Sequence, residues 1–350
     1  MELNGLIDRL AAFAPVPYPF ISLYLDGRPD EHGKDRYETF VRKELAAQAE
    51  RFEPRTAERE SFDRDTTRIH AWLAGEARAS ADGLAIFACA GYQDFFEAVQ
   101  LDVPIERHQF LVANVPRILP LARLADRYRR YAAVVLDTRS ARIFVFSLGE
   151  TVLAEAIEGE RTNRTDVGGW SQARYQRHID NFTLQHVKDV VQALDELART
   201  ERIERVVLAG EEAVMPMLKE HLPKHLEERL AQFVRLETAA EDHIVRDRTL
   251  AAMREAEAQD RATRVARVLD AHGARGLGAA GVDEVREALV NGQVHELLIG
   301  ATLDPNVAER LVVQARTTSA QVTFVDDPAL LDAAGGVAAR LRYRIGGIAA

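Results

Sequence analysis

The chain has 350 residues, of which 47% are hydrophobic and 29% charged, with a net charge of −10. This length predicts two or three domains, each with enough apolar residues for a core. The negative charge argues against a protein that coats nucleic acid over its whole surface. The start, MELNGLIDRL, lacks the pattern of a signal peptide, and no apolar run approaches the ~20 residues of a membrane span. We therefore expect a cytoplasmic protein without a membrane segment.

The first predicted domain covers residues 1–127 and mixes strands with helices. Strands are indicated by apolar or alternating runs, several of them bounded by Gly or Pro, at residues 20–26, 83–89, 94–103 and 109–115. Helical patterns rich in Ala, Glu and Arg cover residues 35–52 and 58–78, and an amphipathic connector covers residues 117–130. The sequence therefore predicts an N-terminal α/β domain.

The second predicted domain covers residues 128–240. Its pattern predicts three short strands, at residues 132–138, 141–148 and 151–158. A polar loop covers residues 158–172, and a long helix runs from residue 173 onward. A buried strand follows at residues 203–210, then helical residues 212–231 with a break at Pro223, and a last strand at 233–237. Three antiparallel strands, a helix, and strands alternating with helices are typical of an RNase H-like α/β domain.

The third predicted domain covers residues 241–350. It opens on one long helical pattern, residues 240–270, whose nearly balanced charge is typical of a solvated helix between domains. Helices and strands then alternate to the end of the chain, which predicts a small α/β/α sandwich. The expected fold class is thus α/β with three domains.

Three places, in the right order, resemble the archaeo-eukaryotic class 1 release factors. The first is VVLDT (134–138) followed by ARIFVF, which looks like the opening of that family's middle domain. The second is the loop RTDVGGWSQARYQRH, Arg164 to His178. The third comprises GAAGVDEVREALVNGQVHELLI (278–299) and the closing GGVAARLRYRI (335–345). Together these places cover about residues 130–345 of the chain.

The loop departs from the family pattern in its spacing. The family places glutamine directly after the second glycine, whereas here Trp170 follows Gly169 and the glutamine is Gln172. This resembles the bacterial branch related to the peptidyl-tRNA hydrolases that rescue stalled large ribosomal subunits, and to Pelota-type factors. Residues 1–125 contain nothing like the family's codon-reading motif, so the resemblance does not extend to stop-codon termination.

The resemblance implies a function, partners and a site. It implies a translation factor that binds the ribosomal tRNA site and hydrolyses the peptidyl-tRNA ester in ribosome rescue, with Gly168, Gly169 and Gln172 as catalytic residues. It implies the large ribosomal subunit and tRNA as partners, with a translational GTPase as a candidate for delivery, and a monomer. It also implies a C-terminal domain like that of kink-turn-binding ribosomal proteins. We expect no cofactor and no metal, since no Cys/His metal spacing or phosphate-binding loop motif is present.

The loop residues suit this chemistry because ester hydrolysis needs a water and a place for the developing oxyanion, not a protein nucleophile. Glycines let the backbone approach a substrate closely. Ser171 is placed to cap the following helix, and Trp170 is either a stacking platform for a base or a core anchor. The expected RNA-binding residues are Arg161, Arg164, Trp170, Ser171, Arg174, Arg177 and His178. Residues 161–178 carry four arginines and one aspartate, a local charge of about +3, which favours a phosphate backbone.

Alternatives remain open. A non-catalytic, hibernation-type factor would occupy the same tRNA site and break no bond, and the shifted glutamine favours it. A nuclease would use Asp137 on the first strand of the middle domain, but two-metal enzymes need several convergent carboxylates, and only Glu211 and Glu212 follow the partner strand. Arginines 340, 342 and 344 alternate along the last strand, where they contact RNA or face solvent on an edge strand.

The positive segment yields a prediction about salt. Replacing Arg174 and Arg177 with alanine should weaken binding to ribosomes or tRNA, because contacts with phosphates are lost. Each lost contact should also lower the slope of log binding constant against log salt concentration by ~0.9 or less. Binding titrations at several salt concentrations measure this slope. An unchanged slope would mean that these two arginines face solvent.

Overall fold

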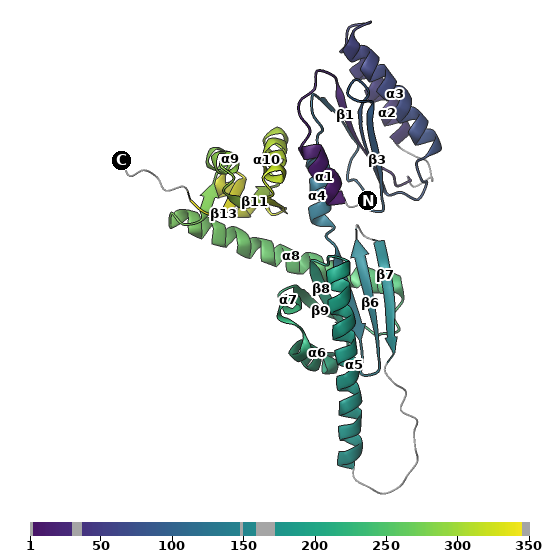
Figure 1. Ribbon diagram of the computed structural model, residues 1–350, viewed down its shortest axis with the longest axis vertical. Coiled ribbons are helices and arrows are strands. Elements are labelled where there is room, and N and C mark those ends of the chain that lie inside the picture. Colours follow the sequence, from purple (N-terminus) through teal and green to yellow (C-terminus); the bar gives the residue numbers. More distant parts are fainter. Residues whose placement is uncertain (1–2, 30–36, 148–149, 159–171, 345–350) are drawn as a thin grey trace. The chain divides into compact units, whose positions relative to one another are not determined.

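The computed structural model describes residues 3–29, 37–147, 150–158 and 172–344 (Figure 1). The expected α/β class is confirmed, with three separate β-sheets in the described part of the chain. The chain divides into two compact units, which are described separately. Unit 1 combines residues 1–127 with residues 261–350, and unit 2 is Tyr128–Asp260. Within these described segments, no helix has the length and apolar character that crossing a membrane requires.

The first sheet of unit 1 is antiparallel throughout, in the order β3-β2-β1-β4. Its strands are β1 (Phe20–Asp26), β2 (Gly83–Cys89), β3 (Phe95–Leu101) and β4 (Gln109–Ala113). Helices α2 (Tyr37–Ala49) and α3 (Ala57–Gly75) cover one of its faces (Figure 1). Residues 21, 23 and 25 of β1 point to this face, because side chains alternate along a strand, and they form a core with apolar residues of both helices. The central strands are therefore fixed in register by burial.

The second sheet of unit 1 has the order β10-β13-β11-β12. Its strands are β10 (Gly278–Ala280), β11 (Val294–Gly300), β12 (Gln321–Val325) and β13 (Val337–Leu341). Strands β11 and β12 are parallel, and β13 is antiparallel to both β10 and β11. Two helices, α9 (Val282–Val290) and α10 (Pro305–Thr317), follow β10 and β11 along the chain. Apolar residues of α8 (Asp242–Gly273), including Val265 and Val268, pack on the sheet with Leu298.

The arginines of the last strand make contacts inside unit 1. Strand β13 lies between β10 and β11 and ends at Leu341, so the alternative of an edge strand is wrong, although all three arginines are exposed. Arg340 lies 3.7 Å from the carboxylate of Glu296. Arg342 donates to the carbonyls of Thr318 and Ser319 at the end of α10, and Arg344 donates to the carbonyl of residue 278. These bonds give all three side chains a structural role at the end of the sheet.

Helix α4 (Leu119–Arg127) is held near both of its ends by buried carboxylates. Glu309 of α10 accepts hydrogen bonds from the backbone N–H groups of Ile118 (2.7 Å) and Leu119 (3.1 Å). These N–H groups lie at the start of the helix and have no intrahelical partner. Near the other end, Asp126 accepts from the N–H of Phe324 (3.0 Å) and from Arg261 (3.2 Å). The two sequence segments of unit 1 are thus joined through α4.

Unit 2 contains one five-stranded mixed sheet in the order β7-β6-β5-β8-β9. Its strands are β5 (Tyr131–Leu136), β6 (Ser140–Ser147), β7 (Glu150–Glu158), β8 (Arg205–Gly210) and β9 (Leu230–Arg235). Strands β5, β6 and β7 form an antiparallel meander, and β8 and β9 add in parallel to β5. The other helices of the unit are α5 (Gln172–Thr200), α6 (Met215–His221) and α7 (Lys224–Glu227).

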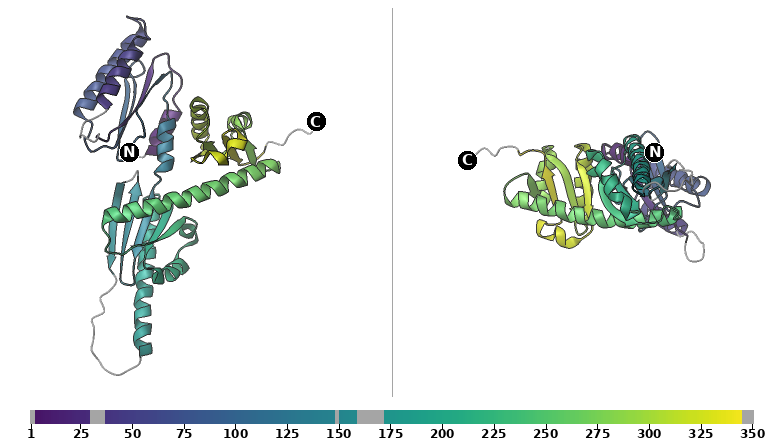
Figure 2. Two further views of the ribbon diagram at one scale, coloured as in Figure 1. Left: turned by 180° about the vertical axis from the view of Figure 1, so that it is seen from behind. Right: turned by 90° about the horizontal axis from the view of Figure 1, so that it is seen from below.

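Strand β5 is buried on both faces, because helices cover the sheet from two sides. Residues 132, 134 and 136 form one core with α5 and α6. Residues 131, 133 and 135 form another core with Val245, Ala252 and Met253 of α8. The two sides are visible in Figures 1 and 2. The continuous apolar run YAAVVL is therefore typical of a strand enclosed between helices.

Asp65 is a fully buried carboxylate on α3. One of its oxygens accepts from the N–H of Ala90 at 2.9 Å, and the other has no hydrogen-bond partner among the described residues. Burial raises the pKa of Asp65 to about 7, although the bond from Ala90 and the charges of Arg64 and Arg68 act in the opposite direction. The folded chain therefore holds a proton at Asp65 up to near-neutral pH.

Substitution of Glu309 tests whether its hydrogen bonds hold the start of α4 to the C-terminal segment of unit 1. Glu309→Ala leaves two buried N–H groups without acceptors, which should lower the free energy of unfolding by about 2–4 kcal/mol. Urea unfolding measures the loss, and hydrogen exchange of the segment 117–121 should become faster. The matched control is Glu287→Ala, since Glu287 is exposed on the neighbouring helix α9. Equal behaviour of the two variants would contradict the role of Glu309.

The buried carboxyl of Asp65 predicts a pH dependence of stability. Its unfolded pKa is ~3.9, so between about pH 4 and pH 7 the folded state holds the extra proton. The free energy of unfolding should therefore fall as pH rises through this window, by up to about 4 kcal/mol for this group, and change little from Asp65 above it.

Asp65→Asn stays neutral and should remove most of this dependence when urea midpoints are compared at pH 5 and pH 8. Asp63→Asn is the control, because the Asp63 carboxylate is exposed on the same helix and pairs with Arg59. If the urea midpoints of the wild type change with pH no more than those of Asp65→Asn do, Asp65 is not the source of the pH dependence.

Candidate functional site

The predicted site lies between the edge strand β7 and the helix α5. Strand β7 ends at Glu158 and α5 begins at Gln172, so the connection between them is residues 159–171. The predicted site residues Arg161, Arg164, Gly168, Gly169, Trp170 and Ser171 belong to this connection and lie outside the described residues. The structure therefore describes the two ends of the predicted site.

The other predicted site residues lie on the first two turns of α5. Gln172 is the first residue of the helix, and Arg174, Arg177 and His178 follow on it. The first N–H groups of a helix have no intrahelical partner and carry a partial positive charge. Anions are favoured at such a helix start. The expected helix after the glycine loop is thus present, and its first turn begins at the glutamine.

The rest of α5 is anchored to the sheet of unit 2. Its buried apolar residues, spaced three or four apart, are Val187, Val190, Val191, Leu194 and Ala198. Each fully buried Val or Leu contributes about 1.5–3 kcal/mol relative to an exposed one, so this half of the helix is firmly held. Figures 1 and 2 show the N-terminal part of α5 continuing past the sheet. The helix therefore carries Gln172 away from the core of its own unit.

Asp137 stabilises the turn between β5 and β6. Its carboxylate accepts from the N–H groups of Arg139 (2.7 Å) and Ser140 (2.8 Å), and from the hydroxyls of Ser140 and Thr238. Burial alone would raise the pKa of Asp137, but these hydrogen bonds outweigh it and lower the pKa below its usual value. The interactions of Asp137 therefore support a structural role.

The two glutamates that follow β8 do not complete a metal site with Asp137. Glu212 is exposed and pairs with Arg235. Within the described segments, no group of three or more His, Cys, Asp or Glu side chains is arranged to hold a metal ion. The convergent carboxylates on which a two-metal nuclease relies are not found in this part of the chain.

His186 is a polar residue of α5 to which the sequence pattern assigned no role. It is 3% exposed, and neither ring nitrogen has a hydrogen-bond partner among the described residues. Its position one helical turn before Val190 on the apolar side of the helix is the signal that would have singled it out. It lies fourteen residues after Gln172, about 21 Å along the helix at 1.5 Å per residue, so it is remote from the predicted catalytic residue.

Comparison with known proteins supports the resemblance found in the sequence. Residues 116–254 match the family model described as Bacterial archaeo-eukaryotic release factor family 10. This segment includes the sheet of unit 2, the connection 159–171 and helix α5. The expected release-factor-like character is therefore confirmed for residues 116–254. A search of curated proteins found no match.

Several solved structures are similar to the chain at low identity. The archaeal translation termination factor aRF1 is 19% identical, with 98% of this chain and 97% of that chain covered and a TM-score of 0.29. Dom34 from S. cerevisiae, described as interacting with Hbs1, is 14% identical, with coverages of 77% and 88% and a TM-score of 0.44. Archaeal Pelota, from a ribosome-bound model with ABCE1, is 17% identical, with coverages of 98% and 95% and a TM-score of 0.45.

Proposed function

We propose, from the release-factor-like character of residues 116–254, that the chain is a translation factor that binds the ribosomal tRNA site and hydrolyses the peptidyl-tRNA ester in ribosome rescue. One observation carries this proposal: the family match encloses the Gly168-Gly169 loop, and the helix that follows begins at Gln172. The displaced glutamine is thus the first residue of a helix directly after the loop.

The proposed domain division follows the three sheets. We assign residues 1–127 to an N-terminal α/β domain, 128–240 to an RNase H-like middle domain, and 241–350 to a linker helix and a C-terminal α/β/α domain like that of kink-turn-binding ribosomal proteins. The order β7-β6-β5-β8-β9, with an antiparallel meander followed by parallel strands, supports the RNase H-like assignment. Helix α8 supports the linker assignment because it begins at Asp242.

In the proposed mechanism, Gln172 positions the attacking water at the ester. The carbonyl carbon is attacked by water, the developing oxyanion accepts hydrogen bonds, and the bond to the tRNA ribose oxygen breaks. Gly168 and Gly169 let the backbone approach the ester, and a well-placed backbone or side-chain donor stabilises the oxyanion by ~3–4 kcal/mol. No protein nucleophile is needed, since the loop contributes geometry and exclusion of bulk water.

The proposed RNA contacts use the local positive charge of the segment. Arg161 and Arg164 precede the glycines, and Arg174, Arg177 and His178 follow Gln172. In a chain of net charge −10, this segment of about +3 favours docking of the tRNA end, with Trp170 stacking on a base and Ser171 capping α5. We propose the large ribosomal subunit and tRNA as partners, delivery by a translational GTPase, and action as a monomer in the cytoplasm.

The test is peptide release from isolated 50S subunits that carry peptidyl-tRNA. Gln172→Ala should lower the release rate by ~100-fold or more while binding changes only a few-fold, because a transition-state contact alters the rate and not ground-state affinity. Gln176→Ala is the matched control, one turn further along the same helix, and should keep the wild-type rate. Gln172→Glu should also fail, because a carboxylate repels the oxyanion.

Two further outcomes divide the alternatives. If Gln172→Ala keeps its activity but Gly169→Ala loses it, the backbone of the loop acts rather than the glutamine side chain. The enzyme proposal is falsified if the wild-type protein binds the 50S complex and releases no peptide above the spontaneous rate. The hibernation-type function would then be supported by equal protection of idle ribosomes by wild type and Gln172→Ala.

A further inference from the structure

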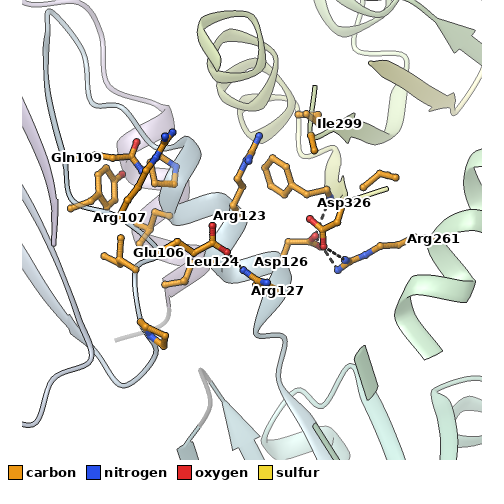
Figure 3. Close-up of a pocket in the computed structure, with 18 residues that line it drawn as sticks. Glu106, Arg107, Gln109, Arg123, Leu124, Asp126, Arg127, Arg261, Ile299 and Asp326 are labelled. Carbon is orange, nitrogen blue, oxygen red and sulfur yellow. Dashed lines mark hydrogen bonds and ion pairs between the residues drawn. The ribbon is translucent and has the colours of Figure 1, made fainter. Parts of the chain in front are cut away.

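A cavity of about 240 Å³ opens in unit 1, far in sequence from the loop of the proposed function (Figure 3). Its walls come from residues 104–109, from α4, and from the C-terminal ends of the parallel strands β11 and β12, where Ile299 and Phe324 contribute. Arg261 of α8 closes one side. The cavity is smaller than the ~300–1,000 Å³ of drug-sized sites, which favours a small ligand.

The charges around the cavity do not balance. Four arginines and three carboxylates line it. All three carboxylates are taken by two of the arginines: Glu106 pairs with Arg127, whereas Asp126 and Asp326 both pair with Arg261, at 3.2 and 3.8 Å. The remaining two are Arg107 and Arg123, which have neither a hydrogen bond nor a carboxylate partner within the described part of the chain. The charged side chains of the lining therefore sum to +1, and two of its guanidinium groups have no carboxylate partner in this part of the chain.

Arg123 is also held in place. Its guanidinium carbon lies 5.3 Å from the centroid of the Phe324 ring, a cation–π contact, and Phe324 is only 6% exposed. The backbone of Phe324 is fixed in turn by its hydrogen bond to Asp126. In Figure 3 the side chains of Arg107 and Arg123 extend in the same direction, and Glu106 and Arg127 lie apart from their ends. A preorganised guanidinium loses less freedom on binding than a mobile one.

We propose that this cavity binds a small phosphomonoester, with Arg107 and Arg123 as its two phosphate-binding side chains. Planar guanidinium groups match the oxygens of a phosphate in a bidentate manner, and neither of these two pairs with a carboxylate among the described residues. The apolar wall at Ile299 and Phe324 suits the organic part of the ligand, of the size of a sugar or a single nucleoside. The site is independent of the proposed peptidyl-tRNA chemistry.

The experiment is calorimetric titration of the full chain in a chloride buffer free of phosphate and sulfate. The probes are AMP, inorganic phosphate, adenosine and a pentamer of uridylate. We expect saturable binding of AMP at one site, weaker binding of inorganic phosphate, and none of adenosine. Arg107→Ala and Arg123→Ala should each weaken AMP binding by about tenfold or more. Both side chains are exposed, and the ring contact of Arg123 with Phe324 is lost only in Arg123→Ala.

The matched control is Arg286→Ala, since Arg286 is an exposed arginine of unit 1 that pairs with Asp283. It should bind AMP as the wild type does. Arg123→Lys keeps the charge but loses the planar contact with Phe324, and should lie between wild type and Arg123→Ala. The proposal is overturned if neither AMP nor phosphate binds up to about 10 mM, which would mean a binding free energy weaker than about 3 kcal/mol. It is also overturned if the alanine variants bind AMP as the wild type does, or if only the uridylate pentamer binds.

Discussion

Burial of β5 on both faces is the constraint on which unit 2 depends. The strand has α5 on one side and α8 on the other, and a shift of its register by one residue would exchange the two cores. Its neighbours β6 and β8 are paired with it over its full length, one antiparallel and one parallel. The position of α5 follows from this sheet, and so does the place at which Gln172 begins the helix. The proposed site is thus tied to the core through helix α5.

Buried carboxylates organise unit 1, and they do so in different ways. Glu309 and Asp126 accept backbone N–H groups, and each connects α4 to the C-terminal segment. Asp65 has one oxygen without a partner among the described residues, and burial raises its pKa to about 7. Glu309 and Asp126 stabilise the fold through these hydrogen bonds, and Asp65 makes stability depend on pH. Such groups are costly to bury, and their energetic effect depends on how completely the surrounding N–H groups satisfy them.

The sequence predicts most of this fold because its strands are marked by apolar runs with Gly or Pro at their ends. Strand β1 begins at Phe20, after Pro19, and β2 ends at Cys89, as the pattern indicates. Helix α1 (Leu3–Ala11) was not predicted. Strand β10 has only three residues, too few for an alternating or apolar run to mark it. The start of α5 was predicted from the loop motif, but Arg107 and Arg123 come to line one cavity with Phe324 through folding alone, and no local pattern marks them as a pair.

Unit 1 is discontinuous in the chain, and this affects the order in which it forms during synthesis. Ile118 and Leu119 are made long before Glu309, which lies 191 residues after Ile118. At ~5–20 residues per second, a ribosome needs about 10–40 s to synthesise that interval. The whole of unit 2 is made within it and is free to fold first. In the nascent N-terminal segment, the first N–H groups of α4 therefore stay hydrated until residues 261–350 emerge and complete unit 1.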